Sequence, residues 1–66
     1  MIYKLKRNKI YMLDGIPVKI IAMSKISVGY IITYERHLVS CSKGKVKVVD
    51  INSRFRELTL LEKELL

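Results

Sequence analysis

The fold is decided by the stretch from Ile10 to Ile20, which reads IYMLDGIPVKI. Its side chains alternate between two faces on both sides of Asp14-Gly15, and a period of two indicates β-strands. An Asp-Gly pair readily adopts the positive backbone dihedrals that a two-residue hairpin turn requires. The stretch therefore predicts an antiparallel hairpin whose second strand directs Ile16, Val18, Ile20 and then Ala22 to the face that enters the core.

The alternation continues to about residue 52 and predicts a total of five short strands. The strand after the first turn is expected at Ile16–Ser24, and the next ones at Val28–Glu35, Leu38–Ser42 and Lys45–Asn52, with Lys43-Gly44 as a turn. In the last strand the apolar face changes between Val48 and Val49, which a β-bulge would reconcile. Tyr30 and Tyr34 are expected to pack in the core, because they alternate with apolar residues on the inward face.

The last segment changes from a strand pattern to a helix pattern. Thr59-Leu60-Leu61-Glu62 fits the S/T-x-x-E capping box, which predicts a short helix over residues 59–66. Leu58, Leu61 and Leu65 form one apolar stripe at spacings of three and four. A helix this short is not stable in isolation, so we expect it to pack on the sheet or on another chain.

Together these elements predict a mostly β fold, a small five-stranded SH3-like or OB-like barrel with a short C-terminal helix. The chain has 66 residues, which suits one small domain over residues 1–66. Strands are expected within about residues 2–52. A domain of this size has little room for a catalytic cavity.

The segment from Lys9 to Ile51, followed by the Leu58-Thr59 step and the leucine-rich end, resembles short phage and prophage proteins. In these proteins an SH3-like barrel ends in a helix that starts with leucine and threonine. The length, the basicity and the order of strands then helix are also similar to the small archaeal chromatin proteins with an SH3-like barrel. Those proteins use a tryptophan on the sheet that faces DNA, and this chain has none.

The basic residues carry the main functional signal, with 13 Lys and Arg against 6 Asp and Glu and a formal net charge of +7. Lys43, Lys45 and Lys47 are expected to leave one strand face about 6.7 Å apart, close to the length of two nucleotides. This stripe is the centre of a predicted phosphate-binding surface. Its flanks are Lys4, Lys6, Arg7 and Lys9 on one side and Arg54 and Arg56 on the other. Tyr11 and Phe55 are candidates for stacking on a base.

The leading hypothesis is therefore a small basic protein that binds nucleic acid through phosphates, with little sequence specificity. A basic face that only keeps the domain soluble is the bland alternative. The phage resemblance implies a second one, an interaction module that uses its sheet edge or its C-terminal helix, with Leu61 and Leu65, to bind and inhibit an acidic host protein. A third is an oligomeric nucleotide-binding protein. Apolar residues on outward faces, such as Ile21 and Ile31, predict a homo-oligomer.

Several function classes are disfavoured by the sequence. One cysteine, Cys41, and one histidine, His37, offer neither an internal disulfide nor a zinc ligand set. No nucleophile and base are arranged for catalysis, so we expect a non-enzymatic protein without cofactors or metal. No apolar run approaches the ~20 residues that span a bilayer, and the basic N-terminus is not followed by a signal-peptide core. A cytoplasmic protein without membrane contact is expected.

Overall fold

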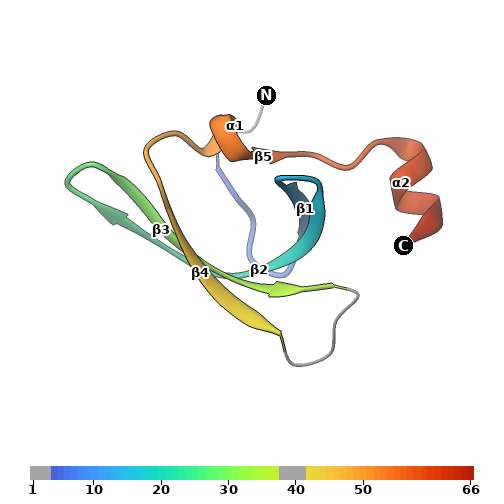
Figure 1. Ribbon diagram of the computed structural model, residues 1–66, viewed down its shortest axis with the longest axis horizontal. Coiled ribbons are helices and arrows are strands. Elements are labelled where there is room, and N and C mark those ends of the chain that lie inside the picture. Colours follow the sequence, from blue (N-terminus) through green and yellow to red (C-terminus); the bar gives the residue numbers. More distant parts are fainter. Residues whose placement is uncertain (1–3, 38–41) are drawn as a thin grey trace.

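The computed structural model describes residues 4–37 and 42–66, which form a mostly β molecule (Figure 1). Within these residues one antiparallel sheet has the strand order β4-β3-β2-β1-β5 and curls into a half-barrel. In chain order the elements are β1 (Ile10–Leu13), β2 (Ile16–Ile26), β3 (Gly29–Arg36), β4 (Lys43–Val48), α1 (Ile51–Arg54), β5 (Phe55–Arg56) and α2 (Leu60–Leu65).

The hairpin predicted around Asp14-Gly15 is confirmed. Asp14 and Gly15 have φ angles of 50° and 83°, and Leu13 pairs with Ile16 across the turn. Two consecutive positive φ angles are what a twisted two-residue hairpin turn requires. Val18 and Ile20 are buried as expected, whereas Ile16, at the start of β2, is 42% exposed.

The long strand β2 contains the bulge of the sheet. Its register against β3 shifts between Ile20 and Ala22, so Ile21 is the extra residue. The backbone carbonyl of Ile21 accepts a hydrogen bond from Arg7 Nε at 3.1 Å. A bulge bends its strand and increases the local twist, which lets β2 serve both halves of the curled sheet. The sequence had placed a bulge near Val48 instead.

The region of β4 is where the predicted strand boundaries were wrong. The expected turn at Lys43-Gly44 lies inside β4, and Gly44 pairs with Tyr34. A side chain at Gly44 would lie 2.8 Å from the Tyr34 ring, so the glycine allows the ring to approach the strand. The expected strand Leu38–Ser42 lies outside the described residues, apart from Ser42, which belongs to no strand.

The end of the expected strand Lys45–Asn52 is a helical turn. The carboxylate of Asp50 accepts a hydrogen bond from the Asn52 N–H at 3.2 Å and caps α1. Ile51 is buried as the first residue of this helix. The change of apolar face after Val48 therefore marks the end of the strand rather than a bulge, because a helix resets which side chains point inward.

The core lies inside the curled sheet and is closed by β5. Phe55 pairs with Leu13, so the last strand returns to lie beside the first. Tyr30 and Tyr34 pack against the core, as predicted. Among the described residues the buried apolar side chains are Leu5, Tyr11, Leu13, Val18, Ile20, Ile32, Val48, Ile51 and Phe55.

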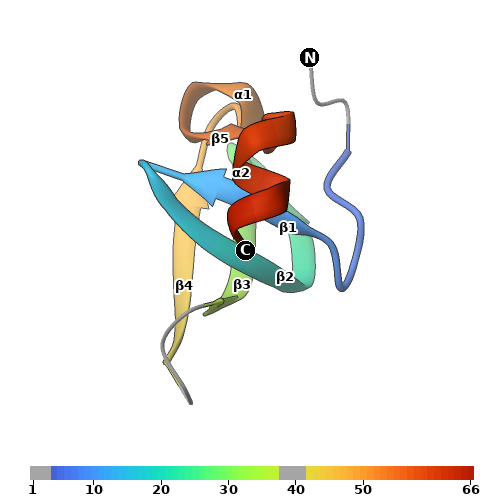
Figure 2. The same ribbon diagram turned by 90° about the vertical axis from the view of Figure 1, so that its right-hand side faces the viewer.

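The capping box and the helix predicted from it are confirmed in α2. Thr59 Oγ1 accepts from the Glu62 N–H at 3.2 Å, and Glu62 Oε1 accepts from the Thr59 N–H at 2.8 Å. The helix stands beside β1 at one side of the half-barrel (Figure 2) and has no buried residue. It borders a shallow hollow that Leu65 and Leu66 share with Met12 and Pro17. In the described parts of the chain, no helix is long and apolar enough to cross a membrane.

Candidate nucleic-acid interface

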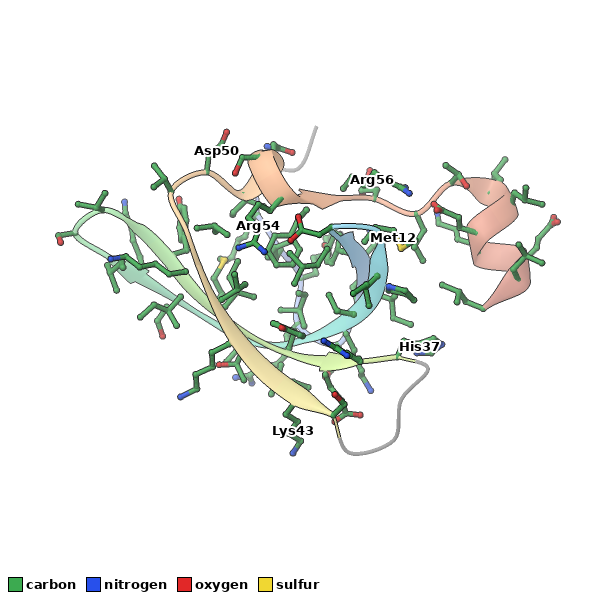
Figure 3. All side chains as sticks on the ribbon, viewed as in Figure 1. Met12, His37, Lys43, Asp50, Arg54 and Arg56 are labelled. Atoms are coloured by element: carbon green, nitrogen blue, oxygen red, sulfur yellow. The ribbon has the colours of Figure 1, made fainter. Side chains whose placement is uncertain are left out.

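Three lysines of β4 lie on the outer face of the half-barrel. Val48 is buried and Val46 packs against the core, so the residues that alternate with them along β4 point to the opposite face of the sheet. These positions hold Lys43, Lys45 and Lys47, here called the β4 lysines, and all three are exposed. Figure 3 shows the labelled Lys43 side chain directed away from the sheet interior. The spacing-two pattern of the sequence is thus realised as a row of cations on an edge strand.

The neighbours of the β4 lysines on this face include one acid and a further lysine. Glu35 on β3 lies opposite Lys43, and Lys19 on β2 lies opposite Glu35. Lys45 faces Thr33 in the same way. No ion pair joins a β4 lysine to any residue that the structure describes. Sequence reasoning missed Lys19 as part of this surface; its outward parity was visible, but its place across the sheet from β4 was not.

A second group of cations comes from the N-terminal segment. Lys4, Lys6 and Arg7, here called the N-terminal cations, are exposed and line a groove of about 700 Å³ beside β2. The segment is anchored to the core, because Leu5 is buried and the Lys6 backbone N–H donates to the Tyr11 hydroxyl at 3.0 Å. The bond from Arg7 to the bulge carbonyl fixes its other end. The sequence-predicted flank of Lys4, Lys6 and Arg7 therefore has a defined position.

The other three predicted phosphate ligands are engaged in ion pairs. Lys9 Nζ lies 3.2 Å from Glu57 Oε1. Arg54 holds Asp14 through two nitrogens, and Arg56 holds Glu62 in the same way at 2.8 and 2.7 Å. Each of these cations is already paired with a carboxylate. A phosphate would have to displace that carboxylate before it could bind the cation. Lys9 and Arg54 thus fasten distant parts of the chain together, and Arg56 ties β5 to α2. None of the three extends the free basic surface.

The two aromatic residues proposed for stacking on a base are in the core. Tyr11 and Phe55 are each only 2% exposed, and a buried ring has no free face for a base. The ammonium group of Lys9 lies over the Tyr11 ring, with Nζ 5.3 Å from the ring centroid. Phe55 turns inward because α1 precedes it and β5 pairs it with Leu13. Both stacking predictions are corrected.

The ion pairs shift the titration of their carboxyl groups. The hydrogen bond from Arg54 lowers the pKa of Asp14, and the hydrogen bond from Lys9 lowers the pKa of Glu57. The strongest shift is at Glu62, where hydrogen bonds from Arg56 and from the Thr59 backbone lower the pKa from 4.5 to about 2. The carboxylate of Glu62 therefore caps α2 and ties it to β5 at the same time.

Helix α2 is expected to lose its attachment in acid. The folded pKa of Glu62 is lower than its ordinary value, so its stabilising effect is complete above pH 4.5 and disappears as the pH falls towards 2. Cα chemical shifts of residues 60–65 should remain helical down to about pH 4.5 and then move towards coil values. Glu62→Gln should abolish this transition, whereas Glu64→Gln, at an exposed position of the same helix, should retain it. An unchanged transition in Glu62→Gln would contradict the assignment.

The remaining predicted site residues are the leucines of α2. Leu61 and Leu65 are 65% and 76% exposed, as a partner-binding helix requires, and their role stays a prediction. Within residues 4–37 and 42–66, no group of three or more His, Cys, Asp or Glu could hold a metal ion. Comparisons of the chain with protein-family models, with curated proteins and with solved structures find no match.

Proposed function

We propose that this protein binds nucleic acid through its phosphates, with little discrimination of sequence. One observation supports this most directly: the β4 lysines project from one face of an edge strand without an ion pair to a described residue. Alternate residues of a strand repeat about every 6.7 Å, which matches two nucleotide steps of about 3.4 Å. Each lysine can then meet a phosphate along one strand of nucleic acid.

The N-terminal cations would extend this surface beyond β2, the strand that follows β3 in the sheet. Lys47 lies opposite Ile31, and Ile31 lies opposite Ser24, which borders the groove of the N-terminal cations. Two strand spacings, about 10 Å, separate β4 from β2, and the N-terminal cations lie beyond that, on the opposite wall of the groove beside β2. A nucleic acid that contacts both groups therefore has to extend across β3 and β2 as well as along β4.

The position of the aromatic rings favours backbone contacts over base stacking. All Tyr and Phe rings that the structure describes lie in the core or pack against it, including Tyr30 and Tyr34. Proteins that prefer single strands commonly stack bases on exposed rings, and this face offers none among the described residues. We therefore expect duplexes to bind at least as tightly as single strands.

The strand order supports the finer assignment of the half-barrel as an SH3-like barrel. Four strands follow one another in space from β1 to β4, and the fifth returns to β1 after the single turn of α1. The long, bulged β2 takes part in both halves of the sheet, as bent strands do in small barrels. The direct β1–β5 pairing is the feature on which this proposal rests.

A salt titration with a matched control tests the proposed function. A fluorescent 20-base-pair duplex and its single strand are titrated with protein at salt concentrations from about 50 to 200 mM. If the β4 lysines and the N-terminal cations each neutralise one phosphate, log affinity should fall with log salt at a slope of about −5.4. The variant Lys43→Gln, Lys45→Gln, Lys47→Gln should reduce the slope to about −2.7 and weaken binding at every salt concentration.

The control variant removes three charges from exposed positions elsewhere, with Lys25→Gln, Arg36→Gln and Lys63→Gln. Because it has the same net charge as the test variant, it separates the β4 surface from overall basicity. We expect its slope to change by less than the contribution of one phosphate. Equal losses in the two variants, or a wild-type affinity that does not depend on salt, would refute the proposed function.

A further inference from the structure

The second half of β2 has an edge that no described strand covers. Strand β1 pairs with β2 only from Ile16 to Lys19, and Asn8 and Lys9 continue the contact as far as Ile20. Beyond the bulge, Ala22 to Ile26 pair with β3 alone. This stretch, here called the open edge, lies on the same side of β2 as the N-terminal segment, which passes it as a coil (Figures 1 and 2).

The backbone groups presented at the open edge follow from the ladder pattern. In an antiparallel pair, successive residues direct their N–H and C=O groups alternately towards the partner strand and away from it. Ile20 directs both groups away from β3, towards Asn8 and Lys9. The extra residue of the bulge shifts this alternation by one, so that Met23 and Lys25 direct theirs to the open edge. No backbone bond from a described residue reaches either of them on that side.

The open edge forms one wall of the groove of about 700 Å³, and the N-terminal segment forms the other. Ala22, Met23 and Ser24 line the β2 wall, and the exposed N-terminal cations line the opposite wall. The groove thus combines unpaired β-sheet donors and acceptors with three positive charges. The open edge spans five residues, or about 17 Å of extended chain.

We propose that this groove binds an extended acidic peptide, which adds a strand to the open edge of β2. An extended polypeptide supplies N–H and C=O groups at the spacing of the edge, and the N-terminal cations favour Asp or Glu in it. A nucleic acid could meet the cations, but it has no backbone that pairs with a β-strand. A second copy of this chain is a poor occupant, because its own edge strand β4 carries the β4 lysines into a groove of the same charge.

This inference goes beyond the proposed function. The two share the N-terminal cations, but the open edge of β2 takes no part in the phosphate-binding surface, so strand addition is tested independently. The peptide should alternate acidic and apolar residues, because its side chains would point to the two sides of the sheet in turn. Met23, which packs against the core, offers apolar surface to one of these sides, and the cations that line the groove attract the acidic residues of the peptide.

The test uses three peptides of equal charge built on a ten-residue alternation of Val and Glu. The first is unmodified, the second is N-methylated on alternate residues, and the third on every residue. Alternate methylation leaves one hydrogen-bonding edge intact, so the second peptide should bind within about twofold of the first. The third has no N–H left to donate to the Met23 and Lys25 carbonyls and should bind at least tenfold more weakly, as expected for the loss of two hydrogen bonds.

Variants of the protein complete the experiment. Lys25→Pro removes an edge N–H that takes no part in the β2–β3 ladder, so the fold should persist and peptide binding should be lost. Lys4→Gln with Lys6→Gln should weaken peptide binding about five- to tenfold at low salt. The triple β4 lysine variant should bind the peptide like the wild type. In the bound state, the Met23 and Lys25 amides should gain protection from hydrogen exchange.

Three outcomes would overturn the proposal. Equal affinity of all three peptides would show that charge alone holds them. Protection of the Met23 and Lys25 amides by an oligonucleotide, but not by the peptide, would assign the groove to nucleic acid. Loss of peptide binding in the triple β4 lysine variant, together with loss of oligonucleotide binding, would place both ligands on the proposed nucleic-acid surface instead.

Discussion

Gly29→Ala is expected to destabilise the protein by about 3 kcal/mol or more, a large part of the total for a small domain. Gly29 begins β3 with a φ of 101°, which already strains any residue with a Cβ atom. A Cβ at this position would lie 2.1 Å from the Val48 carbonyl oxygen and 2.8 Å from the Val49 Cα. These are backbone atoms, so the end of β4 would have to move away from β3.

Gly15→Ala is the matched control for this prediction. Gly15 also has a positive φ, 83°, but a Cβ there would meet no atom within 4 Å. Its cost should be limited to the backbone strain, about 1 kcal/mol. Urea unfolding followed by circular dichroism measures both variants. Similar losses at the two glycines would mean that the contact with Val48 is relieved without opening the β3–β4 pair.

Phe55→Ala is expected to cost about 3–5 kcal/mol and to leave little folded protein at room temperature. The ring is 2% exposed and belongs to the strand that closes the sheet against Leu13. Removing it creates a cavity at the point where β5 is held. Phe55→Leu should cost clearly less, because it retains most of the buried apolar volume.

The same variants separate a core role from a nucleic-acid role for Phe55. If the ring stacked on a base, Phe55→Ala would weaken oligonucleotide binding and leave the urea midpoint unchanged. We expect the reverse for Phe55→Leu, which should lower the midpoint and leave the salt-dependent affinity as it is. Thermal unfolding and the duplex titration together provide the measurement.

Local signals in the sequence were sufficient for the elements that local chemistry determines. Asp14-Gly15 specifies its turn through backbone dihedrals, and Thr59 with Glu62 specifies a helix start through two reciprocal hydrogen bonds. Val18 and Ile20 follow from strand alternation once the turn is placed. Each of these features is decided within a few residues, so no knowledge of the distant chain is needed.

Features that depend on distant partners could not be predicted in the same way. The change of face after Val48 fits a bulge or a strand end equally well, and the packing of Ile51 in a core built from other strands distinguishes them. Gly44 has the composition of a turn, but it lies in β4 beneath the Tyr34 ring.

The candidate site shows the same limit. The β4 lysines were correctly placed on one strand face, because strand parity is a local property. Arg54 and Lys9 were predicted as free cations, yet their carboxylate partners are 40 and 48 positions away in the chain. Charge counts along the sequence do not reveal such pairs, since the fold alone brings Asp14 and Glu57 to them.

The pairing of β1 with β5 has a consequence for synthesis of the chain. Strand β1 is made early, but Arg54 and Phe55, which cover its edge and its turn, are made 40 or more positions later. Until then, the edge of β1 that faces away from β2 has no partner strand, and such edges pair readily with other chains. A product that terminates before Phe55 would retain this edge permanently, so we infer that premature termination yields aggregation-prone fragments rather than partly active domains.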